Sequence, residues 1–211
     1  MATGEKDGCL DTEAGKQLLE YARAVVAAVV TDGSPPPAPD LPVLSEKRGT
    51  FVTLKSDGEL RGCIGRPRPD QPLEAALNAA ATEAATADPR FPPVSPDELE
   101  TITVSVSVLT PPEALPDIGP ADIVVGRDGL MIATGRQRGL LLPQVAADRD
   151  WSAEKFLREA AKKAGLPPDA WERENTTVKR FSAQVFAEES PHGGLRVQDY
   201  TQAAVDGQPT D

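Results

Sequence analysis

The segment with the clearest chemical potential is an Arg-Gly-Cys-Ile-Gly run centred on Cys63. Arg61, Arg66 and Arg68 lie close to this cysteine in a chain that is otherwise acidic. Nearby guanidinium groups favour the thiolate over the thiol, and the thiolate is the nucleophilic form of cysteine. In the alternative interpretation Cys63 is a small buried hydrophobic residue and the arginines are solvated. The sequence leaves both interpretations open.

Glycine and one further arginine complete the set of candidate site residues. Gly62 and Gly65 have no Cβ, which lets a ligand or another backbone approach the cysteine closely. Arg90 belongs to a rigid Asp-Pro-Arg-Phe-Pro-Pro segment and either projects toward a ligand or fixes its own loop by packing. The candidate catalytic residue is therefore Cys63, and the candidate ligand-binding residues are Arg61, Gly62, Gly65, Arg66, Arg68 and Arg90.

Several familiar kinds of site have no support in the sequence. A Cys-His nucleophile pair requires a nearby base, but His192, the only histidine, lies in a Gly-rich C-terminal segment. One histidine and the separated Cys9 and Cys63 do not match the ligand spacing of a zinc site, so no metal site is predicted. Phosphate-binding glycine motifs and the nucleophile elbow are absent from the sequence. No cofactor is indicated, and whether the chain is an enzyme stays open.

A second polar cluster falls in residues 126–129 and 135–139, where glycines alternate with Arg127, Asp128, Arg136 and Arg138. Backbone amides and guanidinium groups in such turns can form an anion-binding rim. The alternative is that the two stretches are ordinary tight turns.

Composition limits the partners that the chain can have. Its 33 acidic and 22 basic residues give a net charge of −11, which disfavours binding to nucleic acid or to an anionic membrane. An acidic surface also suits concentrated salt, so a halophilic source is a hypothesis. The sequence has no apolar run of membrane-spanning length and no basic, apolar leader, and its two cysteines cannot build a disulfide framework. We therefore expect a cytoplasmic protein with reduced thiols.

The elements expected to position Cys63 follow from hydrophobic periodicity and turn residues. Apolar residues at helical spacing predict helices over residues 12–31 and 72–88. Residues 49–54 and 60–65 are predicted strands joined by a short Ser-Asp-Gly turn, which places Cys63 near a strand end.

The remaining elements are predicted in the same way. Residues 101–109 alternate apolar and polar side chains, which predicts a strand with one solvated face. We further expect a hairpin of residues 123–125 and 130–133, a short strand at 140–142, a helix from Ser152 to Ala164 and a last strand at 178–187. This order predicts one α+β domain over residues 11–190, with mainly antiparallel sheet, flanking helices and tails at 1–10 and 191–211.

The chain also resembles a known family. It carries Leu-Arg-Gly-Cys-Ile-Gly over residues 60–65, Asp-Pro-Arg-Phe over residues 88–91, and Leu-Leu-Leu-Pro-Gln-Val-Ala over residues 140–146. In order and spacing these runs are similar to the AMMECR domain family, over roughly residues 11–190. The resemblance implies a two-lobed α+β fold with the Cys63 motif near a cleft between the lobes. Related sequences often have a second cysteine where this chain has Ala161.

The resemblance implies no particular reaction. The local positive charge in an acidic chain instead motivates our main hypothesis, a ligand-binding or enzymatic domain with a cleft centred on Cys63, in which Arg61 and Arg66 or Arg68 bind an anionic group and Cys63 acts as nucleophile or contact. The family is often linked with Memo-type and radical-SAM proteins, so the alternative is a non-catalytic subunit that docks onto one of them.

Overall fold

The computed structural model describes residues 9–115 and 118–202, so parts of both predicted tails lie outside the described residues. The chain forms two compact units, each built of α and β elements. Of the described residues, those up to Pro111 together with Gln184–Gln198 form the first unit, and those within Pro112–Ala183 together with residues 199–202 form the second. Within the described ranges, no helix is both long and apolar enough to span a membrane.

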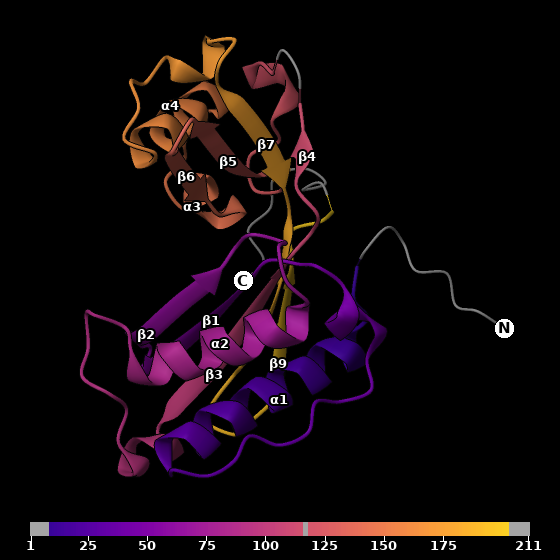
Figure 1. Ribbon diagram of the computed structural model, residues 1–211, viewed down its shortest axis with the longest axis vertical. Helices are drawn as coiled ribbons and strands as arrows, with labels where there is room; N and C mark the ends of the chain where they lie inside the picture. Colours follow the sequence, from indigo (N-terminus) through magenta and orange to yellow (C-terminus); the bar gives the residue numbers. More distant parts are fainter. Residues whose placement is uncertain (1–8, 116–117, 203–211) are drawn as a thin grey trace, which may run out of the picture. The chain divides into compact units, whose positions relative to one another are not determined.

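A five-stranded sheet forms the centre of the first unit, in the order β2-β1-β3-β8-β9. The strands are β1 (Thr50–Ser56), β2 (Glu59–Arg66), β3 (Ile102–Leu109), β8 (Ala183–Glu188) and β9 (Leu195–Asp199). Strand β1 pairs antiparallel with both β2 and β3 (Figure 1). Asp57 and Gly58, both with positive φ, form the tight turn of the predicted β1–β2 hairpin.

Two long helices lie against one face of this sheet (Figure 1). Helix α1 (Thr12–Val30) begins at Asp11, whose side chain accepts a hydrogen bond from the Ala14 amide, and α2 (Leu73–Thr86) follows Pro72. The apolar faces that the sequence predicted for both helices pack with Val52, Val104 and Val106 of the sheet into one buried cluster. The short 3-10 helices η1 (Pro42–Ser45) and η2 (Pro96–Glu100) complete the unit, and Ser95 and Glu98 form the capping box of η2.

The second unit contains a four-stranded antiparallel sheet in the order β4-β7-β5-β6. Its strands are β4 (Glu113–Ala114), β5 (Gly129–Thr134), β6 (Gln137–Leu141) and β7 (Thr177–Phe181). Its helical segments are α3 (Pro143–Ala147), α4 (Ala153–Lys163), η3 (Pro120–Asp122) and η4 (Ala170–Glu172). The unit has its own apolar cluster, in which Phe156 and Leu157 of α4 pack with Leu130 and Ile132 of β5. The α+β class with antiparallel sheets and flanking helices is thus as predicted.

The face of β3 predicted to be solvated is covered, since Thr103 and Ser105 are half-buried and Ser107 is buried. Three predicted elements also differ. Residues 123–125 form no strand, and the second hairpin pairs β5 with β6 around Gly135, whose φ is 59°. The predicted last strand, 178–187, is two strands that belong to different sheets, β7 beside β5 and β8 beside β3. Residues 195–199, assigned to a tail, form edge strand β9. Most of the β9 side chains are exposed, which explains why its sequence shows no apolar periodicity.

Candidate functional site

Strand β2 positions Cys63 directly opposite Thr53 of β1. The Thr53 hydroxyl donates a hydrogen bond to the Cys63 sulfur at 3.3 Å, and the cysteine is half-buried. Neighbouring Gly62 is buried against the backbone of Ala84 in α2. Because successive side chains of a strand point to opposite faces, the thiol lies on the sheet face away from α2.

Asp88 and Arg90 close the open edge of β2 at Cys63. The Asp88 carboxylate accepts a hydrogen bond from the Cys63 amide at 2.8 Å, and the Arg90 guanidinium donates to the Cys63 carbonyl oxygen at 3.0 Å. An edge strand exposes unpaired backbone groups, and these two side chains satisfy them as a neighbouring strand would. The backbone on both sides of the thiol is therefore held in place.

Asp88 and Arg90 together form a clamp on the Cys63 backbone. Electrostatic attraction between the two side chains strengthens it. Asp88 is buried and accepts from Arg90 Nε at 2.9 Å and from Nη2 at 2.7 Å. The hydrogen bonds from the Arg90 side chain hold the pKa of Asp88 well below its usual range, although burial opposes this shift. The same pair raises the pKa of Arg90. Asp88 is therefore a permanent anion at neutral pH.

Arg61 has a structural role in the fold. The β1–β2 register shifts between Leu54 and Lys55, so Arg61 has no partner residue in β1. Its guanidinium donates to both carboxylate oxygens of Glu98, at 2.6 and 3.0 Å. It also donates to the carbonyl oxygens of Pro92 and Pro93, at 2.9 and 3.2 Å.

These contacts change the pKa of Glu98 and use the hydrogen-bond donors of Arg61. The hydrogen bonds from Arg61 lower the pKa of Glu98 to about 2. All three nitrogens of the Arg61 guanidinium donate hydrogen bonds within the protein, which use four of its five N–H groups.

Arg66 and Arg68 are also paired with carboxylates. Arg66 forms an ion pair with Glu83 of α2, and its Nε is buried without a hydrogen-bond partner. Arg68 is exposed and lies 3.6 Å from Asp70. The positive charge that the sequence places around Cys63 is therefore largely compensated by neighbouring acids.

Gly62 and Gly65 make close contacts within the protein. A Cβ on Gly62 would lie 2.2 Å from the Ala84 carbonyl oxygen, and one on Gly65 would lie 2.1 Å from the Phe51 ring. Of the two explanations offered by the sequence, close approach of another backbone accounts for Gly62, whereas Gly65 lies against a side chain, the Phe51 ring.

Other candidate groups from the sequence lie elsewhere. His192 lies 3.7 Å from Glu100, and within the described residues it makes no hydrogen bond to the Cys63 thiol. Neither Cys63 nor Cys9 takes part in a disulfide. In residues 9–115 and 118–202 no three His, Cys, Asp or Glu side chains form a metal-binding group.

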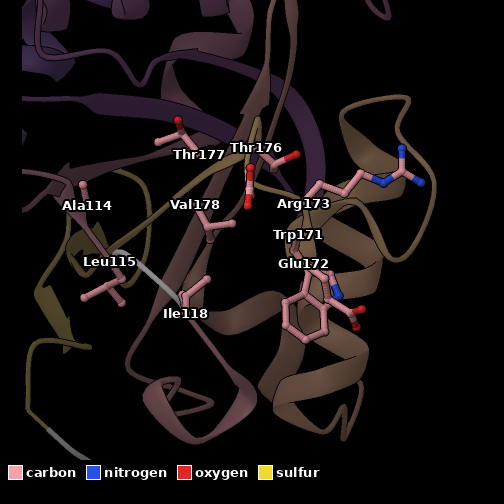
Figure 2. Close-up of a pocket in the computed structure, with 10 residues that line it drawn as sticks. Ala114, Leu115, Ile118, Trp171, Glu172, Arg173, Thr176, Thr177 and Val178 are labelled. Carbon is pink, nitrogen blue, oxygen red and sulfur yellow. The ribbon is translucent and has the colours of Figure 1, made fainter.

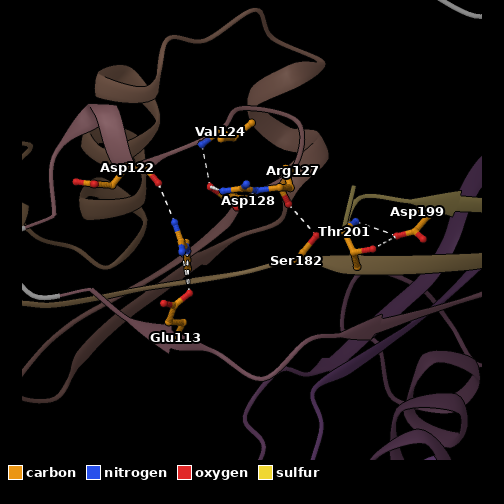
Figure 3. A network of polar contacts seen from close by, with 9 residues as sticks. Glu113, Asp122, Val124, Arg127, Asp128, Ser182, Asp199 and Thr201 are labelled. Carbon is orange, nitrogen blue, oxygen red and sulfur yellow. Dashed lines mark hydrogen bonds and ion pairs between the residues drawn. The ribbon is translucent and has the colours of Figure 1, made fainter. Parts of the chain in front are cut away.

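The second polar cluster is built around Asp128. Its carboxylate accepts from the Val124 amide at 2.8 Å and from Arg127 Nε at 2.7 Å, as Figure 3 shows. The Arg127 carbonyl oxygen accepts from the Ser182 hydroxyl at 2.9 Å. These bonds stabilise a turn, and the hydrogen bonds that Arg127 donates to Asp128 raise the pKa of Arg127.

The sequence did not identify Thr53, Asp88 or Glu98 as parts of the site. Asp88 lies 25 residues from Cys63, and Glu98 lies 37 residues from Arg61. The prolines in the sequence indicated that the segment containing Asp88 and Arg90 is rigid. They did not indicate that this segment pairs with strand β2.

Comparisons with known proteins agree with the family resemblance. The family model described as AMMECR1 matches residues 19–186. A protein of Methanothermobacter thermautotrophicus is 50% identical over 186 residues, covering 85% of this chain and 97% of its own. One of Methanocaldococcus jannaschii is 48% identical over 196 residues, covering 87% of this chain and 94% of its own.

A solved structure gives the same result. The crystal structure of the uncharacterized protein PH0010 from Pyrococcus horikoshii superposes with a TM-score of 0.80 at 43% sequence identity. The match covers 90% of this chain and 98% of that one. Sequence and fold thus agree over nearly the whole chain, and the protein belongs to the AMMECR1 family.

Proposed function

We propose that the protein is a ligand-binding domain whose site is centred on Cys63, with the thiol as a direct contact or nucleophile and Arg90 as the group that binds an anionic part of the ligand. The observation that supports this proposal most is the clamp of Asp88 and Arg90 on the Cys63 backbone. A thiol held in one position on a partly exposed sheet face is prepared for contact with a ligand.

Arg90 is better placed than the other arginines to bind an anionic part of the ligand. Its side chain is 51% exposed, and its Nη1 has no hydrogen-bond partner among the described residues. Nε and Nη2 are used by Asp88 and Cys63, which fixes the plane of the guanidinium. The remaining donors are therefore presented in a set direction beside the cysteine.

The contacts of the thiol favour binding over general-base catalysis. The sulfur accepts a hydrogen bond from the Thr53 hydroxyl, and Asp88 bonds to the Cys63 amide and not to the sulfur. A general base must lie within hydrogen-bond reach of the proton that it removes. The proposal includes the reduced, cytoplasmic setting expected from the sequence.

The proposal is tested by comparing Cys63→Ser with Cys9→Ser, both purified from the same cells. Small molecules are extracted from each protein after denaturation and compared by mass spectrometry. We expect a compound that Cys9→Ser retains and Cys63→Ser loses. Equal retention by both variants, or absence of any retained compound from both, would contradict a ligand site centred on Cys63.

A second candidate function is a non-catalytic subunit that docks onto a Memo-type or radical-SAM protein. It is favoured by Leu60, a large apolar side chain that is 39% exposed on edge strand β2. The test is co-purification with a co-expressed Memo-type or radical-SAM protein. Capture that survives Cys63→Ser but falls after Leu60→Ser would support docking over the Cys63 site.

A further inference from the structure

The second unit, which does not contain Cys63, has a hollow of about 630 Å³. It lies beside strands β4 and β7 and the 3-10 helix η4, each of which contributes residues to its lining. A volume of this size is within the range of pockets that hold small organic molecules.

One part of the wall of the hollow is apolar. In Figure 2 the indole of Trp171 lies on one side and Leu115 and Ile118 on the other, with Val178 between them. Ile118 and Val178 belong to the buried cluster of this unit, and Leu115 and Trp171 pack against it. These walls suit an apolar group rather than a chain of water molecules.

The polar groups at the hollow are two acids, Glu172 and Glu174, one base, Arg173, and the hydroxyl groups of Thr176 and Thr177. Glu172 and Glu174 both line it and are exposed, and neither has a hydrogen bond or ion pair within the described residues. Arg173, the cation beside them, already lies 3.3 Å from Asp169. The Nε1 atom of Trp171 is buried and has no acceptor in the described part of the chain. The hollow therefore combines an aromatic face with two uncompensated carboxylates.

We infer that this hollow binds a small organic cation, an ammonium group carried on an apolar body. An ammonium group is attracted to the face of an aromatic ring, and tryptophan provides the strongest such site. The carboxylates of Glu172 and Glu174 add attraction for the same charge, and Leu115, Ile118 and Val178 contact the apolar body. An anion of the same shape meets two like charges and one cation, Arg173, whose charge Asp169 partly offsets.

The test uses two probes with the same ring and opposite charges, 2-phenylethylammonium and phenylacetate. Trp171 is one of two tryptophans, so Trp151→Phe leaves its fluorescence as a reporter at the hollow. We expect a saturable fluorescence change with 2-phenylethylammonium and an affinity about tenfold higher than that for phenylacetate. Added salt reduces the difference in affinity between the two probes, because it screens the charges of the exposed carboxylates.

Matched variants locate the binding. Ala114 is exposed and lines the hollow, so Ala114→Phe fills the space without disturbing the core, while exposed Ala121, which is not part of the lining, provides the control Ala121→Phe. We expect binding to be lost in Ala114→Phe and kept in Ala121→Phe. In the double variant Glu172→Gln and Glu174→Gln, the two probes bind with nearly equal affinity.

Three results would overturn the inference. They are no saturable signal with 2-phenylethylammonium, equal affinity for both probes in the parent protein, and unchanged binding in Ala114→Phe.

Discussion

At the scale of single residues, Asp88 organises the surroundings of Cys63. One buried carboxylate accepts hydrogen bonds from the Cys63 amide and from the side chain of Arg90. Arg90 in turn donates a hydrogen bond to the Cys63 carbonyl oxygen. Both the amide and the carbonyl group of Cys63 are therefore hydrogen-bonded to the clamp. Removing a partner from such a buried charged network costs more than a single exposed ion pair contributes.

Two carboxyl groups near the site make the folded protein sensitive to acid. Glu98 has a folded-state pKa of about 2, against 4.5 for the unconstrained group, and the pKa of Asp88 is lowered in the same direction. A lowered pKa contributes stability that is complete above the unfolded-state value and is lost as the pH falls toward the folded-state value. We expect the free energy of unfolding to fall steadily between pH 4.5 and about 2.

Urea unfolding at a series of pH values checks this prediction. Glu98→Gln is expected to lower stability at pH 7 and to make the acid slope shallower, since the variant has no carboxyl group to titrate at this position. The control is Glu20→Gln, because Glu20 is exposed and only loosely paired with Lys16 at 3.8 Å. The same acid slope in Glu98→Gln as in Glu20→Gln would show that the Arg61–Glu98 pair does not determine it.

At the scale of elements, the close packing of β2 on α2 determines where Cys63 lies. Gly62 is the contact point, since its α-carbon faces the carbonyl oxygen of Ala84 with no room for a side chain. The next residue of the strand necessarily points to the other face. A change that separates β2 from α2 therefore also displaces the thiol.

Gly62→Ala tests this contact. The added Cβ would lie 2.2 Å from a backbone oxygen, and backbone cannot move aside as a flexible side chain does. We expect a loss of about 3 kcal/mol in the free energy of unfolding, measured with urea. The control is Gly33→Ala, where the nearest atom would be 3.5 Å away and a change within about 0.5 kcal/mol is expected. Equal effects of the two substitutions would mean that β2 and α2 are not tightly packed.

At the scale of the whole molecule, the buried residues form two clusters, one in each unit. Trp151 and Trp171 both belong to the second unit, whereas the two longest helices, of 19 and 14 residues, belong to the first. Tryptophan fluorescence therefore reports on the second unit, and far-UV circular dichroism draws most of its helical signal from the first.

Core truncations in each unit test whether the clusters unfold separately. Leu77→Ala in the first cluster should cost about 2–5 kcal/mol and shift the circular dichroism transition more than the fluorescence transition. Phe156→Ala in the second cluster should do the reverse. If both signals shift together in both variants, the molecule unfolds as one cooperative unit.

The sequence by itself determined the local elements and the family. Helices α1 and α4 and the β1–β2 hairpin follow from apolar spacing, the cap Ser152, and an Asp-Gly turn. These signals act within a few residues, so they can be read without knowing the rest of the fold. The same reasoning placed Cys63 on a strand.

The tertiary structure alone decided which groups meet. It split the run from Thr177 to Glu188 between two sheets, paired Arg61 with Glu98 and Cys63 with Asp88, and formed the hollow beside Trp171. Such contacts depend on strand order, register and packing between distant segments, and a local pattern carries no information on any of these. The physical reason is that a charge or a thiol acquires its chemistry from neighbours in space, and the chain brings those neighbours together only when it folds.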